Sequence, residues 1–185
     1  MIGGVVFWLV VALVPIWSLG AYNRLVRLRA QVISQFAAVE QRMGQALALL
    51  GEAASRPELA TMKDGAAPMR ATAAQGIAGL QAAAIQLEVA LGIARKQPLD
   101  ADAVAALRTA YATVHDVWSH RLDGATMSAS PEAAAVQRAW ESHSVAVREA
   151  STHFNTAVQA YNAAISQFPA SMLAYVFGFS PAAQV

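Results

Sequence analysis

The sequence contains no cysteine, few charged residues and no strong excess of either charge. Without cysteine the chain can form neither disulfides nor thiolate metal sites, and a cysteine nucleophile is excluded as well. Only 14% of the residues are charged and the formal net charge is +1, so there is no basic field to hold nucleic acid nonspecifically. We therefore expect no nucleic-acid partner.

Motifs for catalysis and cofactor binding are missing too. The serines lie in neither a G-x-S-x-G nor an S-x-x-K pattern, and no glycine-rich loop is grouped before a helix where it could bind phosphate. Among the four histidines, His143 lies on an apolar helical stripe and His153 shares a helix face with Glu149. No Glu-x-x-His pair occurs, although di-iron bundles use two. We expect no catalytic residue, no cofactor and no metal, and we rank an enzyme below two other classes.

The stretch Ile2–Ala21 is uncharged and almost entirely apolar, and Trp8 and Trp17 lie towards its two ends. A helix of this length spans about 30 Å, the thickness of a bilayer's hydrocarbon core. Pro15 lies within it, and membrane helices tolerate proline because neighbouring groups satisfy the freed carbonyl. The stretch lacks the polar face of an interfacial or core helix and the basic start of a signal peptide, although a cleaved signal stays the main alternative. We predict a transmembrane anchor at 2–21.

Basic residues lie on one side of this stretch only. Arg24, Arg27 and Arg29 follow it, whereas no lysine or arginine precedes it. The positive-inside rule then predicts an N-terminus outside the cell and a cytoplasmic body.

Beyond the anchor, apolar residues recur in alternating steps of three and four, which is the pattern of one buried helix face. We expect helices over about 2–54, 68–96, 100–123 and 131–167, with Asp100 as an N-cap and Pro131 at a first helical position. Residues 56–68 are expected to form a connection and 124–130 a loop. The predicted fold class is all-α: a single N-terminal transmembrane helix that continues into an antiparallel four-helix bundle, 22–169, with long first and last helices.

Residues 170–185 follow as an apolar tail. An antiparallel bundle returns the end of its fourth helix to the membrane-proximal end of the first. The tail is too short to span a membrane, so it either caps the bundle or contacts lipid beside the anchor.

Two groups of residues, one near each end of the chain, form a recognisable signature. They are Tyr22, Asn23, Arg24, Leu25 and Arg27 after the anchor, then Asn155, Tyr161, Asn162, Phe168, Pro169, Gly178 and Phe179. Their order and spacing resemble the LemA family of bacterial membrane-anchored helical proteins. That family typically shows YN-x-LV-x-LR, then YN-x₂-V-x₂-YN-x₂-I-x₂-FP and a closing GF.

The resemblance implies a four-helix bundle on a single N-terminal anchor in the bacterial inner membrane, with no established enzymatic chemistry. The sequence departs from the family pattern in two places. Residues 41–47 lack the usual Ile-Pro-Asn element, and residues 180–185 replace the usual aromatic-rich end.

Asn155 and Asn162 lie seven positions apart and therefore on nearly the same helix face. A buried amide needs a partner, and Tyr22 and Asn23 lie at the antiparallel end of the first helix. We expect hydrogen bonds among these groups to fix helix register, a structural role rather than a binding one.

Two functions fit these features. The first is a non-enzymatic membrane-anchored scaffold, whose body presents a surface to protein partners that the sequence does not name; a homo-oligomer is one such arrangement. The alternative is a lipid-interacting protein that organises or remodels the membrane through the bundle end and the apolar tail.

Overall fold

The computed structural model describes residues 2–55, 67–123, 131–168 and 170–185, with side chains described for most residues from Trp17 onward. These ranges are all-helical and contain no strand. The helices are α1 (Ile2–Ser55), α3 (Ala67–Lys96), α4 (Ala101–Asp123), α5 (Pro131–Ser166) and α6 (Ala170–Phe177). The all-α class and the predicted extents of the four long helices are confirmed. The predicted loop at 124–130 and most of the predicted connection at 56–68 lie outside the described residues.

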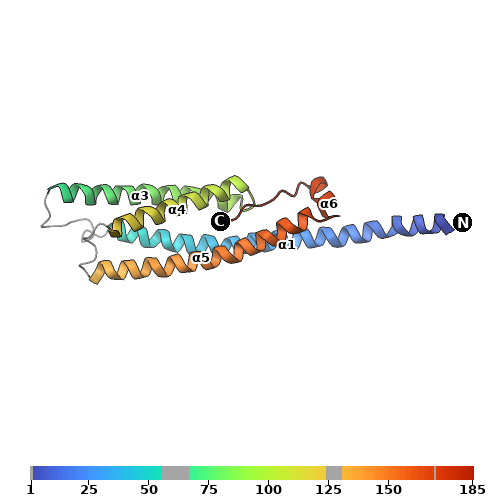
Figure 1. The fold of residues 1–185 in the computed structure, drawn as a ribbon, viewed down its shortest axis with the longest axis horizontal. Coiled ribbons are helices and arrows are strands. Elements are labelled where there is room, and N and C mark those ends of the chain that lie inside the picture. The colour runs from blue at the N-terminus through green and yellow to red at the C-terminus, as the bar shows by residue number, and fades with distance from the viewer. Residues whose placement is uncertain (1, 56–66, 124–130, 169) are drawn as a thin grey trace.

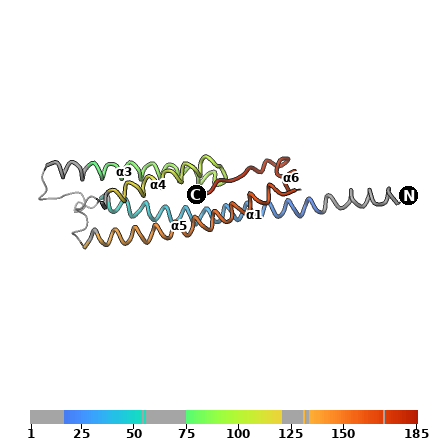
Figure 2. The backbone as a smooth tube through the Cα atoms, in the orientation of Figure 1, coloured from blue at the N-terminus to red at the C-terminus, as the bar shows by residue number. Residues whose placement is uncertain are grey.

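Helix α1 is the support on which α3, α5 and α6 pack, while α4 packs on α3 (Figure 1). It contacts α5 over a long interface, α3 along another part of its length and α6 towards its N-terminal side. Helices α3 and α4 form an antiparallel pair, and α1 extends beyond all the others at its N-terminal end (Figure 2 shows the same path as a tube). The molecule is therefore elongated, and its long helices lie roughly along its long axis.

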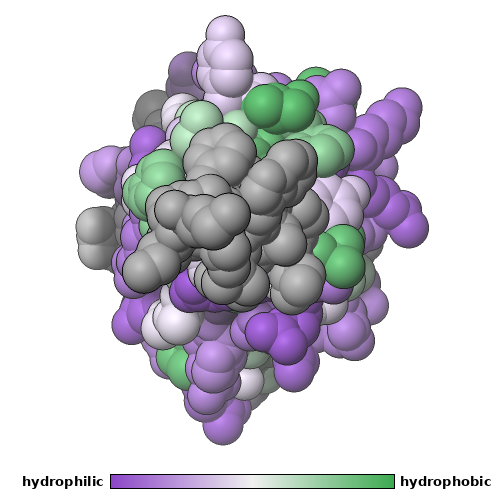
Figure 3. Space-filling model, turned by 90° about the vertical axis from the view of Figure 1, so that its right-hand side faces the viewer, coloured by the Kyte–Doolittle hydropathy of each residue, from purple (hydrophilic) through white to green (hydrophobic). Residues whose placement is uncertain are grey.

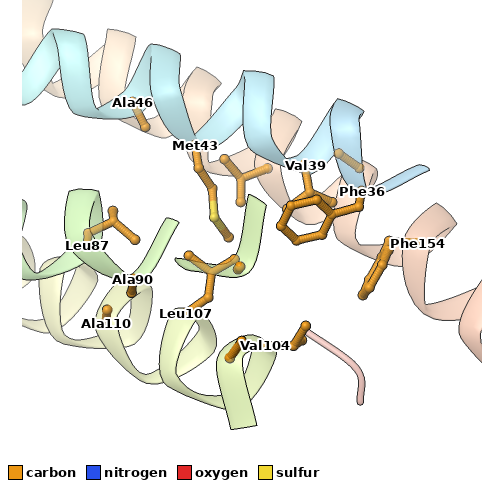
Figure 4. Packing of buried hydrophobic residues seen from close by; sticks show 14 of the residues in the cluster. Phe36, Val39, Met43, Ala46, Leu87, Ala90, Val104, Leu107, Ala110 and Phe154 are labelled. Carbon is orange, nitrogen blue, oxygen red and sulfur yellow. The ribbon is translucent and has the colours of Figure 1, made fainter. Parts of the chain in front are cut away.

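The core forms where the apolar faces of these helices meet. On α1 the described buried residues are Leu25, Val32, Phe36, Val39, Met43, Ala46, Leu50 and Ala53, which from Val32 onward follow the predicted steps of three and four. Phe36 of α1 meets Phe154 of α5 with ring centroids 5.7 Å apart and an interplanar angle of 66°, an edge-on contact that aromatic pairs prefer. Figure 4 shows these two rings beside Val39 and Met43, with Leu107 of α4 facing them.

The buried face of α3 follows the periodic pattern at Leu80, Leu87 and Ala94. Between these positions Ala83 and Ala90 are buried, whereas their neighbours Ala84 and Leu91 are only half-buried. The small alanines let α3 approach its neighbours closely, and this leaves an apolar stripe of Ile85, Val89 and Ile93 exposed on the outer side.

The start of α4 follows the predicted chemistry. The main-chain N–H of Ala103 donates to the Asp100 carboxylate at 2.8 Å, the hydrogen bond of an N-cap. Nearby, Arg95 of α3 pairs with Glu40 of α1 at 3.1 Å; both side chains reach solvent, so the ion pair adds little stability.

Among the residues whose side chains are described, one segment is long and apolar enough to cross a membrane, Gln75–Lys96 of α3. It passes by length and composition alone, and it packs against α4 and α1 as a helix of the core would. The predicted anchor lies mostly outside those residues, so this finding neither supports nor opposes it.

Candidate functional site

The chain turns sharply at the end of α6, and the turn explains the Gly178-Phe179 motif. Gly178 has a φ of 68°, the left-handed conformation that costs residues with a Cβ about 1–2 kcal/mol. The Phe179 N–H donates to the Ala174 carbonyl at 2.9 Å, spanning the last turn of the helix. This 6→1 bond together with the left-handed glycine is typical of a Schellman motif. The motif therefore ends α6 and reverses the chain.

Phe179 then meets the motif that follows the predicted anchor. The Tyr22 ring lies 5.0 Å from that of Phe177 and 6.3 Å from that of Phe179. The Arg29 guanidinium lies 5.9 Å above the Phe179 ring, within range of a cation–π interaction. Trp17 and Phe168 form a further aromatic pair at 6.3 Å. The two ends of the family signature are thus in contact, as the antiparallel arrangement predicts.

The segment that follows, Ser180–Val185, has no helix or strand of its own and runs back from α6 along the molecule (Figure 1). Two asparagines of α5 hold it by its main chain. The Asn162 amide donates to the Ala182 carbonyl at 2.8 Å and accepts from the Ala182 N–H at 3.0 Å. The Asn155 amide does the same with Val185, at 2.9 Å for both bonds. We call this set of contacts the asparagine clamp.

Tyr161 adds a fifth bond to the clamp, since its hydroxyl donates to the Ser180 carbonyl at 3.0 Å. The side chain is 1% exposed and packs in the core beside this bond. Burial raises the pKa of Tyr161, and the nearby Arg29 charge opposes that effect. The phenol therefore stays a hydrogen-bond donor at neutral pH.

The clamp corrects the sequence-based expectation for the two asparagines. They bind the main chain of the tail rather than Tyr22 or Asn23, and Asn23 is exposed. Residues 180–185, which depart from the family pattern, are the segment that the two family asparagines hold. The asparagine spacing was the available signal, because it marks a helix face with two amides to satisfy.

The remaining signature residues divide into packing and surface positions. Leu25 is fully buried, Arg24 and Arg27 are exposed, and Phe168 is 78% exposed. Pro169 lies outside the described residues. Arg29 was not among the predicted site residues, yet it is the arginine that contacts the ring of Phe179, directly before the clamped segment.

Among the side chains that the structure describes, no group of three histidine, aspartate or glutamate residues could hold a metal. His115 instead lies against Trp140, with ring centroids 6.4 Å apart, and Trp140 also packs on Trp118 at 5.2 Å. On the same helix as His115, burial raises the pKa of Tyr111. The Ser144 hydroxyl and the Arg148 charge lower this pKa and so partly offset the effect of burial. The described histidines thus sit in packing or surface environments.

These features define an all-helical protein in which a long N-terminal helix is joined to the C-terminal end through an aromatic cluster and a main-chain clamp. The LemA family model matches residues 94–185, so the part of the chain that contains α4, α5, α6 and the clamped segment is similar to the LemA family. The resemblance is thereby confirmed over the part that carries Asn155, Asn162 and Gly178. No curated protein and no solved structure matches the chain.

Replacing Gly178 with alanine should loosen the end of α6. A Cβ at this position meets no atom within 4 Å, so the penalty comes only from the left-handed backbone. We expect the free energy of local opening to fall by about 1 kcal/mol. If chymotrypsin cleaves only the opened form, cleavage after Tyr175 or Phe177 should become about fivefold faster. Gly44→Ala is the matched control, because Gly44 lies inside α1 in equally open space. Equal cleavage rates for Gly178→Ala and the unmodified chain would contradict the assignment.

Proposed function

We propose that the protein is a non-enzymatic, membrane-anchored helical scaffold of the LemA type. In this proposal residues 2–21 cross the bacterial inner membrane once, with the N-terminus outside. Helices α1, α3, α4 and α5 form a four-helix bundle in the cytoplasm and present their outer faces to protein partners.

The continuity of α1 is the observation that carries the proposal. The helix has 54 residues and so is about 80 Å long, and among its described side chains, which begin at Trp17, the first buried one is Leu25. The uncharged stretch Ile2–Ala21 matches about 30 Å of hydrocarbon. A rigid helix shared between membrane and bundle would hold the bundle at a fixed distance from the bilayer, which is what a scaffold requires.

The outer face of α3 supports an interaction role. Ile85, Val89 and Ile93 are 61%, 58% and 51% exposed and lie on one side of the helix. Exposed apolar residues that gather on one face are typical of contact surfaces, either with another protein or with a second copy of the chain.

The topology of this proposal can be tested with a single cysteine, since the chain has none. Gln97→Cys places a thiol at an exposed position between α3 and α4. In cells with a permeabilised outer envelope and a sealed inner membrane, a membrane-impermeant maleimide should label it only after lysis. Labelling before lysis would contradict a cytoplasmic bundle.

A second candidate function, contact with lipid at the end of the bundle, is supported by a separate observation. Phe168, Met172, Tyr175, Val176 and Phe177 are all more than half exposed, from 57% to 91%. They lie beside α1 near Trp17 and Leu19, which are exposed too. Figure 3 views the molecule from this end and shows hydrophobic residues among hydrophilic ones. In the proposed topology this apolar end would lie at the lipid headgroups, with Arg24 and Arg27 available to anionic lipid.

A nitroxide at Tyr175→Cys in the full chain, reconstituted in vesicles that contain anionic lipid, tests this contact. If α6 lies in the interface, the label should collide more often with oxygen, which partitions into lipid, than with a water-soluble nickel chelate. A label at Val145→Cys is the control, because Val145 is 58% exposed on α5, far from α6 along the helix. The same accessibility ratio at both positions would show that α6 only caps the bundle.

A further inference from the structure

The asparagine clamp recognises main chain and not side chains. Each amide pairs with the N–H and the carbonyl of one residue, as a neighbouring strand would, at distances of 2.8–3.0 Å. Any residue other than proline can supply the main-chain N–H and oxygen of these four bonds. The clamp therefore recognises a segment by the conformation of its main chain.

The distance between the two asparagines along α5 matches the distance between the two tail residues that they hold. Seven residues of α-helix rise about 10.5 Å, which separates Asn155 from Asn162 along α5. Three residues of extended chain span about 9–10 Å, which separates Ala182 from Val185. A polyproline II segment also makes one turn in three residues, so when it runs antiparallel to α5 it presents residues three apart to the same side, whereas a β-strand alternates sides with a period of two. The geometry therefore selects an extended chain of this kind and rejects a helical one.

Side-chain requirements are few. Ala182 is 6% exposed, so the residue held by Asn162 must be small, while Val185 is half-buried. Ser180, Pro181 and Gln184 are exposed. Pro181 also favours an extended backbone for itself and for Ser180, and it has no N–H that would need a partner.

The occupant is held mainly by these five bonds and by proximity. It buries one side chain fully, Ala182, and is tied to α5 through α6 and the turn at Gly178. A short tether gives a segment an effective concentration in the millimolar range, which is enough to fill a weak site. The structure therefore holds the bound form of an intramolecular peptide ligand.

We propose that the face of α5 with Asn155, Tyr161 and Asn162 is a binding site for an extended polypeptide, which residues 180–185 occupy in cis. The ligand class is an extended segment with a small residue at the position that Asn162 holds, and such a segment from a partner replaces the tail. This site does not depend on the membrane anchor, so a failure here would leave the proposed scaffold topology untouched.

The test uses the full chain with its tail displaced. Ala182→Glu brings a charge to a buried position and should release the tail while leaving α5 unchanged. The probe is a fluorescent peptide, Ser-Pro-Ala-Ala-Gln-Val, whose binding is followed by anisotropy. The Ala182→Glu chain should bind it at least tenfold more tightly than the unmodified chain, whose site is already filled. Adding Asn155→Ala and Asn162→Ala should abolish binding, whereas adding Gln159→Ala, at an exposed position of the same helix, should not.

Two N-methylated peptides provide the matched control for main-chain recognition. Methylation of the third residue, the counterpart of Ala182, removes the N–H that donates to Asn162 and should weaken binding more than tenfold. Methylation of the fourth residue, whose N–H is outside the five bonds of the clamp, should have a much smaller effect.

Tail release is read independently from a nitroxide at Gln184→Cys, which is exposed. The label should be immobile in the otherwise unmodified chain and mobile in the Ala182→Glu chain and in the double asparagine variant. Three results would overturn the proposal: no peptide binding once the tail is mobile, binding that persists without the asparagines, or a label that stays immobile in both variants.

Discussion

The pairing of two asparagine amides with the main-chain N–H and oxygen of two tail residues is the interaction on which the C-terminal end of the molecule depends. A segment without helix or strand needs partners for its main-chain groups, and a primary amide presents an N–H donor and a C=O acceptor on the same edge. Asn155 and Asn162 supply both, and Tyr161 supplies a further donor. Because the tail is fixed in this way, Phe179 is fixed at its start.

Because Phe179 contacts α1, the position of the tail also determines how the C-terminal end packs on the first helix. Phe179 completes the cap of α6 and contacts Tyr22 and Arg29 of α1. The family signature can therefore be understood as one physical unit. Its asparagines hold the tail, its glycine turns the chain, and its two aromatic residues, Tyr22 and Phe179, join the last helix to the first. A change to either asparagine acts on this whole unit and not on a single loop.

The long helices could be predicted from the sequence because their periodicity and end signals agree. Asp100 and Pro131 mark helix starts, and both act as local chemistry requires. The buried face of α3 was harder, since alanine is frequent around the whole helix and gives the pattern no preferred side. Leu80 and Leu87 are buried, but Ile85 and Val89 lie outside while Ala83 and Ala90 are buried, so residue size alone does not decide the buried face of this helix.

Helix α6 and the clamp could not be derived in the same way. Helix α6 has only eight residues, seven of them apolar, which is too short a stretch to establish a period, and the helix contacts α1 and α5. The asparagine spacing revealed a shared face, but an amide accepts many partners, and the small residues of 180–185 carry no motif that names them. A segment that is bound through its main chain needs no particular side chains, so its sequence contains no motif that would predict the contact.

Amide hydrogen exchange across residues 182–185, measured by NMR on the full chain, tests the clamp most directly. The Ala182 and Val185 N–H groups donate to the two asparagines and should exchange slowly. The Ala183 and Gln184 N–H groups lie between them, outside the bonds of the clamp, and should exchange much faster. This pattern, slow at positions three apart, is what main-chain recognition by α5 predicts. Uniformly fast exchange over the four residues would contradict it and would leave the two asparagines without the role assigned to them.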